Sequence, residues 1–373
     1  MNSTDKLFLL DAYALIYRSY YAFIKNPRIN SKGFNTSAIL GFVNTLEEVL
    51  KKENPTHIGV AFDPSGPTFR HEAYEQYKAQ REETPEAIRL SVPIIKDIIR
   101  AYRIPILEVS GYEADDVIGT LATEAGRQGI ITYMMTPDKD YGQLVSDNVF
   151  MYRPKHSGGF EVMGIDEIKA KFNIRSTEQV IDMLGLMGDS SDNIPGCPGV
   201  GEKTAQKLVA EFGSIENLLA HTDQLKGALK TKVEANREMI TFSKFLATIK
   251  VDVPIKLDMT TLVREEPDEE KLRKIFEELE FRTLIDRVLK KSGAPLSSSS
   301  NSVSPDLYAG TLFARPVDSP TPENNGPVQG DLFANFADNG TGNAENSNLT
   351  HLEMLDVDYQ LIDTEEKRSE IIQ

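Results

Sequence analysis

Apolar runs of strand length recur over residues 7–138, and each leads into an acidic residue or an acidic cluster. Asp11 follows "LFLL", Asp63 follows "GVAF" and Asp138 follows "YMMTP", while the run "IPILEV" leads directly into "GYEADD". Segments with helical periodicity, such as "SAILGFVNTLEEVLKK", lie between these runs. Strands that alternate with helices predict an α/β domain on a mostly parallel sheet with flanking helices.

The pattern changes twice further along the chain. From about residue 165 the strand-like runs stop, and segments such as "KTAQKLVAEFG" and "DEEKLRKIFEELEF" predict helices. Beyond residue 291, stretches rich in Ser, Pro, Asn and Gly have too few apolar residues to offset the entropy of ordering. We therefore expect an α/β core (1–165), a helical region (166–291), a disordered C-terminal linker (292–355) and the start of a truncated further domain (356–373).

The net charge of −16 does not argue against a nucleic-acid partner, because it is unevenly distributed. Residues from 291 onward hold 13 acidic and 4 basic residues, which leaves 44 acidic and 37 basic residues in the first 290. No stretch approaches the roughly 18 apolar residues of a membrane span. The N-terminus lacks signal-peptide features, and Cys197 is the single cysteine. We expect a cytoplasmic, nucleoid-associated protein with no membrane partner.

The acids at the ends of the predicted strands form the candidate site, because ligands of α/β sheets bind at the carboxyl ends of strands. Crowded carboxylates repel one another unless cations neutralise them. An all-oxygen set without a Cys–His cluster favours two Mg²⁺ or Mn²⁺ ions, which at a separation of roughly 4 Å can hydrolyse a phosphodiester. The nine candidate metal ligands are Asp11, Asp63, Glu113, Asp115, Asp116, Asp138, Asp140, Asp189 and Asp192.

Any single acid of this set has a plainer explanation. Acids at the start of a helix are favoured by capping and by the helix dipole. Asp189 and Asp192 in "GDSSDN" could merely shape the turn before "NIPG". The spacing of the whole set is what favours a metal site over nine independent caps.

A glycine turn at 196–201 resembles two nucleotide-binding motifs but satisfies neither. In a Walker loop the second glycine is followed directly by lysine, but here Glu202 lies between Gly201 and Lys203. A dinucleotide-binding fingerprint needs glycine at position 204, where this chain has Thr204. A tight turn that opens a helix suits a backbone phosphate, although a purely structural helix–helix turn is the alternative. The candidate phosphate-binding residues here are Gly199, Gly201, Lys203, Thr204 and Lys207.

The segment "FRHEAYEQYKAQREETP" (69–85) combines cations with aromatic rings. Lys78 and Arg81 are three positions apart, which predicts one helical face with Tyr77 nearby. Cations for phosphates and rings for bases are typical of single-strand binding. Arg70, at the start of the segment, is a further candidate DNA contact.

These motifs occur together in the order seen in one known family. "LLDAYALIYRSYYAF", "FRHEAYEQYKAQR", "GYEADD", "TPDKD", "GDSSDNIPG" and "PGVGEKTA" make the chain similar to the 5′-nuclease (flap endonuclease) family over about residues 5–290. Within it, the likeness is greatest to the nuclease domain that precedes a bacterial DNA polymerase. The terminal "YQLIDTEEKRSEIIQ" resembles the start of a 3′-5′ exonuclease-like domain.

The resemblance implies a structure-specific 5′-3′ nuclease that acts on DNA with a 5′ flap or at an RNA–DNA junction, with a covalently linked polymerase region. It implies one metal on Asp11, Asp63, Glu113, Asp115 and Asp116 and a second on Asp138, Asp140, Asp189 and Asp192, with Lys78, Arg81, Asp116 and Asp140 catalytic. Lys78 and Arg81 would lie in a helical arch at about 69–90, Tyr77 would stack near the unpaired end, and Arg18 would contact the backbone. The turn 199–203 would be a helix–two-turn–helix element, often with bound K⁺.

One apolar island interrupts the expected linker. "QGDLFANF" (329–336) is similar to the short peptides that dock bacterial sliding clamps, with Gln329, Leu332 and Phe333 as anchors. A few anchors on a disordered chain suffice for such docking. A chance Leu-Phe pair is the alternative.

Two other functions remain open at this point. The chain could be a non-catalytic DNA-junction-binding module whose acids are decorative, or a related metal-dependent ribonuclease of the same α/β type. Loss of several carboxylates would indicate the first, and none is missing. The basic–aromatic segment and the glycine turn favour the DNA-junction enzyme over the second.

Overall fold

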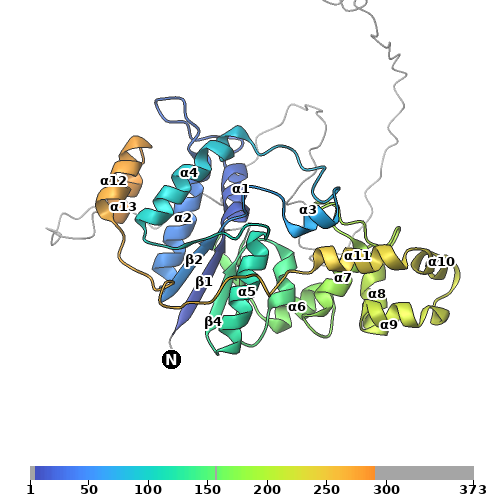
Figure 1. Ribbon diagram of the computed structural model, residues 1–373. Helices are drawn as coiled ribbons and strands as arrows, with labels where there is room; N and C mark the ends of the chain where they lie inside the picture. Colours follow the sequence, from blue (N-terminus) through green and yellow to red (C-terminus); the bar gives the residue numbers. More distant parts are fainter. Residues whose placement is uncertain (1–4, 156–157, 290–373) are drawn as a thin grey trace, which may run out of the picture. The chain divides into compact units, whose positions relative to one another are not determined.

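A six-stranded sheet with the strand order β3-β2-β1-β4-β5-β6 forms the centre of the described fold. The computed structural model describes residues 5–155 and 158–289 (Figure 1). Strands β1 to β5 pair in parallel, and β6 pairs antiparallel with β5, so the predicted mostly parallel sheet is confirmed. The strands are β1 (Lys6–Asp11), β2 (His57–Ala61), β3 (Ile106–Leu107), β4 (Ile131–Met135), β5 (Val149–Pro154) and β6 (Phe160–Met163). The sequence analysis did not predict the last two.

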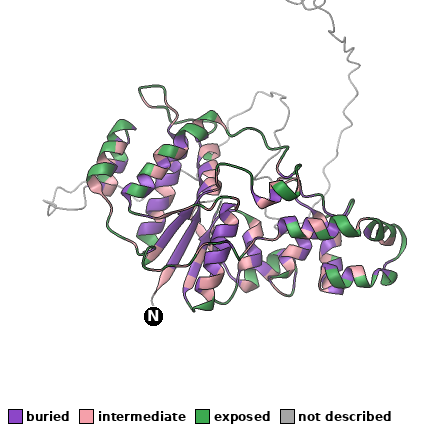
Figure 2. Cartoon of the chain, in the orientation of Figure 1, coloured by how far each residue is buried: buried purple, intermediate pink, exposed green. Residues whose placement is uncertain are grey.

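Both faces of the sheet are covered, which explains why its strands are continuous apolar runs. Side chains alternate along β1, so that Leu7 and Leu9 join one buried cluster while Phe8 and Leu10 join another. Figure 2 shows the central strands almost wholly buried between the helices. The apolar sequence of β1 is therefore the direct consequence of its central position.

The cluster around Phe8 and Leu10 unites helices near the start of the chain with the last two helices of the described ranges. These elements are α1 (Ala12–Ala22), α2 (Ser37–Lys52), α4 (Glu86–Ala101), α12 (Glu269–Glu278) and α13 (Arg282–Leu289). Leu272 and Phe276 of α12 are fully buried in this cluster. The expected boundary was wrong here, because 269–289 packs with the α/β core and not with the helical region predicted for 166–291.

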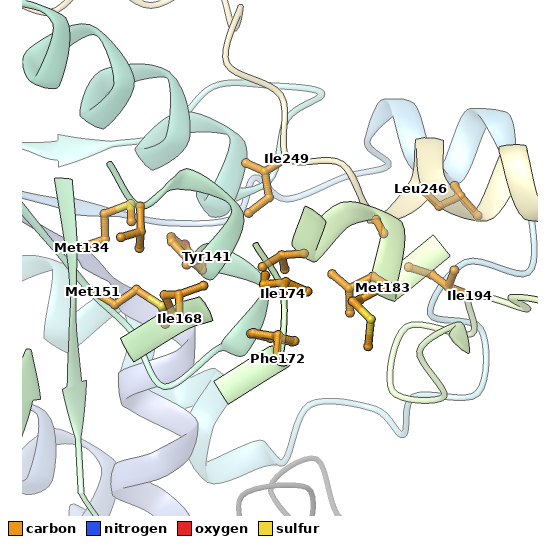
Figure 3. Close-up of a cluster of buried hydrophobic side chains, with 14 of the residues drawn as sticks. Met134, Tyr141, Met151, Ile168, Phe172, Ile174, Met183, Ile194, Leu246 and Ile249 are labelled. Atoms are coloured by element: carbon orange, nitrogen blue, oxygen red, sulfur yellow. The ribbon is translucent and has the colours of Figure 1, made fainter. Parts of the chain in front are cut away.

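The opposite face packs against α5 (Ala114–Arg127) and continues into the helical region. Figure 3 shows Met134 and Met151 of the sheet close to Tyr141, Ile168 and Phe172. The elements that follow β4 and β6 are η1 (Lys139–Leu144), α6 (Ile165–Phe172), α7 (Gln179–Met187), α8 (Glu202–Phe212), α9 (Ile215–Ala220), η2 (Thr222–Gln224), α10 (Gly227–Ala235) and α11 (Arg237–Ala247). One apolar cluster therefore runs from the sheet into the helical region.

The predicted helical arch is not a helix between residues 74 and 85. Helix α3 (Phe69–Ala73) is short, turns follow it, and Lys78 has a left-handed φ of 56°. The main chain of this segment is bonded to a distant one instead: Lys78 N–H donates to Asp192 O (3.0 Å), and Asn193 Nδ2 donates to Gln76 O (2.7 Å). These long-range bonds take the place of helical i→i−4 bonds.

Within the described ranges, no helix combines the length and the apolar character needed to cross a membrane.

Candidate active site

The candidate site lies at the topological switch point of the sheet, where the strand order reverses. From β1 the chain adds β2 on one side, while β4 pairs on the other side of β1. Connections that diverge in this way leave a crevice at the carboxyl ends of the two central strands. Asp11 is the last residue of β1, and Asp138 follows β4 by three positions. The topology thus places these two acids at the carboxyl ends of neighbouring strands.

Asp11 is held rigidly at this edge. It is 9% exposed and caps α1, with Oδ1 accepting from Ala14 N–H at 3.1 Å. Oδ2 accepts from Tyr141 OH (3.1 Å) and Thr136 Oγ1 (3.3 Å), two residues that the sequence analysis missed. Burial, with further contributions from Asp63 and other groups, raises the pKa of Asp11 to about 7.

The "GYEADD" acids form the start of α5. Glu113 is the N-cap, and its N–H donates to Oδ2 of Asp116 at 3.1 Å, which makes a capping box. Asp63 reaches the same turn, since its Oδ1 accepts from Ala114 N–H at 2.7 Å. Burial and the neighbouring Asp116 raise the pKa of Asp115 well above its usual range. Capping and the clustering of charge are therefore combined in the same residues.

The second group of acids comes from η1 and the turn after α7. Asp138 accepts from Asp140 N–H at 3.0 Å, and Asp189 accepts from Ser191 N–H at 2.8 Å. Burial, together with Asp138 and Asp189, raises the pKa of Asp140 well above its usual range. Oδ1 of Asp140 is buried and has no hydrogen-bond partner among the described residues.

Besides Arg70, three cations lie directly against the acids. Lys78 Nζ is 2.7 Å from Oε1 of Glu113 and 3.7 Å from Oδ2 of Asp192. Arg81 pairs with Asp192 as well. Although burial raises it, Lys78 and Arg81 lower the pKa of Asp192 to about 2. Lys139, which the sequence analysis did not single out, lies 3.0 Å from Oδ2 of Asp189.

These ion pairs affect whether the carboxylates are available to bind a metal ion. Across 5–155 and 158–289, no three Asp, Glu, His or Cys side chains are arranged so that they could hold one metal ion. Basic side chains contact several of the carboxylates. The donor set is nevertheless all oxygen, as hard divalent cations require. The partnerless Oδ1 of Asp140 is an acceptor that such a cation would satisfy. The donor chemistry of these carboxylates suits a hard divalent cation, while Lys78 and Arg81 lie beside Glu113 and Asp192 in this structure.

Three predicted site residues have different surroundings from those expected. Asp116 is fully buried and directed at Arg70, with both oxygens hydrogen-bonded, so it does not face the other acids as a metal ligand or catalytic group would. Arg70 is 1% exposed and therefore is not a DNA contact. Tyr77 is 3% exposed and donates its hydroxyl to Glu113 (3.0 Å), so its ring is not available for stacking.

The predicted backbone-binding residues lie away from the acids. Arg18 on α1 donates from Nη2 to Lys155 O at 2.8 Å. In the turn before α8, Gly199 has a left-handed φ of 76°, which glycine adopts without strain, and Gly201 is the N-cap. Four of the five predicted turn residues are exposed, namely Gly199, Gly201, Lys203 and Lys207, while Thr204 is partly buried. Nζ of Lys232 lies against Gly199 and was missed, because α10 is distant in sequence.

The chain belongs to the 5′-3′ exonuclease family. The model of the 5′-3′ exonuclease N-terminal, resolvase-like domain matches residues 6–173, and that of the C-terminal SAM fold matches 175–270. The family is one of 5′-3′ exonucleases, which are hydrolases. The expected family and α/β fold are thereby confirmed.

Among curated relatives, DNA polymerase I of Bacillus caldotenax is 41% identical over 286 residues, which cover 76% of this chain and 32% of that protein. DNA polymerase I of Bacillus subtilis is 41% identical over 291 residues, covering 77% and 33%. The chain thus spans about a third of the length of these relatives.

Solved structures share the fold at lower identity. Bacteriophage T5 5′-exonuclease with bound zinc has a TM-score of 0.55 and 22% identity, over 74% of this chain and 98% of that one. T5 flap endonuclease in a complex with DNA and metal ions has a TM-score of 0.54 and 22% identity, over 74% and 99%. The catalytic core of Rad2 with DNA substrate has a TM-score of 0.52 and 20% identity, over 76% and 93%.

Proposed function

We propose that this chain hydrolyses phosphodiesters at 5′ flaps and RNA-primer ends during DNA replication and repair, by a reaction that requires two divalent metal ions. It would act in the cytoplasm as the N-terminal nuclease part of a DNA polymerase I. The observation that carries the proposal is that acids from five separate segments lie close enough to shift one another's pKa, with an acceptor of Asp140 left without a partner among the described residues.

The residues divide into two ligand groups. Asp11, Asp63, Glu113 and Asp115 surround the ends of β1 and β2 and the start of α5, and would hold one ion. Asp138, Asp140, Asp189 and Asp192 would hold the second. The chemistry that such ions supply when bound is polarisation of the scissile phosphate and a lowered pKa for the attacking water. T5 and Rad2 structures with metal ions or DNA support this reading of the shared fold.

The protein's own cations would bind and orient the substrate. Lys78 and Arg81 now neutralise Glu113 and Asp192, and a phosphate that enters with divalent ions offers them a new partner. Released from the carboxylates, both side chains would lie beside the scissile phosphate and stabilise its developing charge. Asp11 must be ionised to act as a ligand, so its raised pKa makes metal binding release protons near neutral pH.

Duplex DNA would be held by the helical region. The turn at 199–203 presents exposed glycines and Lys203 at the N-terminus of α8, where main-chain amides suit a backbone phosphate. A K⁺ ion held at this turn would supply further positive charge for the phosphate. Lys232 beside Gly199 adds a charge at the same place.

A cleavage assay tests the proposal. Labelled 5′-flap DNA should be cut at the junction with Mg²⁺, and EDTA should abolish cutting. Asp115→Asn and Asp140→Asn should each reduce the rate by at least about 100-fold, whereas Asp97→Asn, an exposed acid that pairs with Arg100, should not. Cutting in EDTA, or full activity of both variants, would refute a metal-dependent nuclease.

The clamp-binding segment lies outside the described residues and remains a separate proposal. Residues 329–336, with Gln329, Leu332 and Phe333 as anchors, would tether the nuclease to the sliding clamp. A peptide of residues 325–338 should bind the clamp, and the same peptide with Leu332→Ala and Phe333→Ala should not. Equal weak binding of both peptides would end the idea.

A further inference from the structure

The carboxylate of Asp116 has no capacity left for a metal ion. Oδ1 accepts from Arg70 Nη2 (2.8 Å) and Lys250 N–H (2.8 Å), and Oδ2 accepts from Arg70 Nη1 (2.8 Å) and Glu113 N–H (3.1 Å). A carboxylate offers about four acceptor positions, and all are used here. A metal could bind this group only by breaking bonds inside a fully buried network.

The hydrogen-bonding capacity of Arg70 is also fully satisfied. Its five N–H groups make five bonds: two to Asp116, one to Oε2 of Glu113 (3.2 Å), and one each to the carbonyls of Leu246 (2.9 Å) and Thr248 (2.9 Å). A planar guanidinium can serve all these acceptors at once, and an ammonium cannot.

The pair therefore joins three segments that are distant in sequence. Arg70 lies in α3, Asp116 in the first turn of α5, and the carbonyls belong to the end of α11 and the residue that follows it. Oε2 of Glu113 is fixed by Arg70 and by Tyr77 OH (3.0 Å), which leaves Oε1 facing Lys78. The orientation of Glu113 thus depends on where α11 ends.

We propose that Asp116 and Arg70 are a positioning pair, which fixes the proposed metal-binding carboxylates of Glu113 and Asp115 and couples them to the helical region. Asp115 is included because its Oδ1 lies 3.9 Å from Arg70 Nη1 and accepts from Asp116 N–H at 2.7 Å. Neither residue touches metal or substrate. The segment from α8 to α11 would bind duplex DNA. The carbonyls of Leu246 and Thr248 would therefore fix the position of the acids relative to the bound duplex. The inference rests on the proposed metal-dependent function.

The test compares four variants by Mn²⁺ calorimetry without DNA, flap cleavage and urea unfolding. Arg70→Lys keeps the positive charge but loses the planar guanidinium, so the variant should still fold. It should bind Mn²⁺ about tenfold more weakly with an unchanged number of sites, which is the usual effect of mutating a residue that supports a metal ligand. Asp116→Asn should show the same loss, and Arg70→Lys with Asp116→Asn should lose no more than either alone. Arg100→Lys, in an exposed pair with Asp97, is the matched control.

Raised Mn²⁺ should restore most of the cleavage rate of Arg70→Lys at saturating DNA, an effect that a purely structural residue would not show. The proposal is overturned if Asp116→Asn removes one Mn²⁺ site while Arg70→Lys binds normally, since Asp116 would then be a ligand. It is also overturned if both variants lose stability but keep wild-type Mn²⁺ affinity. Failure of the wild-type protein to bind Mn²⁺ at all would instead refute the proposed function.

Discussion

Nζ of Lys78 lies 2.7 Å from Oε1 of Glu113 and 3.7 Å from Oδ2 of Asp192, so one lysine bridges the two groups of acids. The attraction of both carboxylates raises the pKa of Lys78 even though burial lowers it, which keeps this ammonium charged. A partly buried cation at this place would compete with any divalent ion for the same carboxylates.

Replacing this lysine should separate metal affinity from catalysis. In Lys78→Met, Mn²⁺ should bind roughly tenfold more tightly because a competing cation is gone, while flap cleavage should fall by about 100-fold because the phosphate loses a partner. Calorimetry and single-turnover cleavage measure the two effects. Lys96→Met, which removes an ion pair with Glu108 at 2.6 Å, is the control and should change neither. Weaker Mn²⁺ binding by Lys78→Met would contradict the competition.

The raised pKa of Asp11 predicts how stability depends on pH in EDTA. Burial first, and then Asp63, raises this pKa from 3.8 to about 7, so folding favours the protonated carboxyl. The stabilisation is complete below about pH 4 and is lost as the pH rises through 7. Between pH 5 and 8 the wild type should lose about 1–3 kcal/mol more than Asp11→Asn in urea unfolding. Parallel pH profiles of the two proteins would show that Asp11 is not the titrating group.

The contact between α7 and α11 should tolerate no side chain at Gly185. A Cβ there would lie 2.8 Å from Cδ1 of Ile215 and 3.0 Å from the main-chain Cα of Lys244. Gly185→Ala should therefore cost about 1–3 kcal/mol in thermal or urea unfolding. Gly66→Ala, where a Cβ meets nothing within 4 Å, should be close to neutral. Equal stability of the two variants would mean that the helices can separate without cost.

Lys232 should contribute to duplex binding without affecting the chemical step. Its Nζ lies against Gly199 in the proposed phosphate-binding turn, on the exposed α10. Lys232→Ala should weaken duplex binding in EDTA and reduce the slope of log affinity against log salt by about one. The rate at saturating DNA should stay unchanged. Lys256→Ala, an exposed lysine outside the helices, is the control. A normal salt slope in Lys232→Ala would exclude this residue from the interface.

The acids of the site were predictable because they follow strands, and a parallel sheet brings the ends of its strands together. Asp11 and Asp138 needed only the pattern of apolar runs to be placed at a common edge. Strands β5 and β6 have a weaker pattern. The apolar run of β5 ends at Tyr152, before Arg153 and Pro154, and that of β6 is interrupted by Glu161 while Val162 is exposed.

The environment of the basic–aromatic segment was not predictable from its own residues. Arg70 and Tyr77 have partners 176 and 115 positions away, so local periodicity carries no trace of them. A helical interpretation of 74–85 fails for the same reason, since the bonds that shape the segment come from 190–193. Local sequence determines which groups are present, while long-range contacts determine which of them are exposed.

Arg70 is anchored on the carbonyls of Leu246 and Thr248, although its charged partners lie before residue 120. Synthesis proceeds from the N-terminus, so a ribosome-bound chain carries all nine acids long before this anchor has emerged. The order of translation therefore means that Arg70 and Asp116 cannot complete their hydrogen-bond network before residues 246–248 have been synthesised.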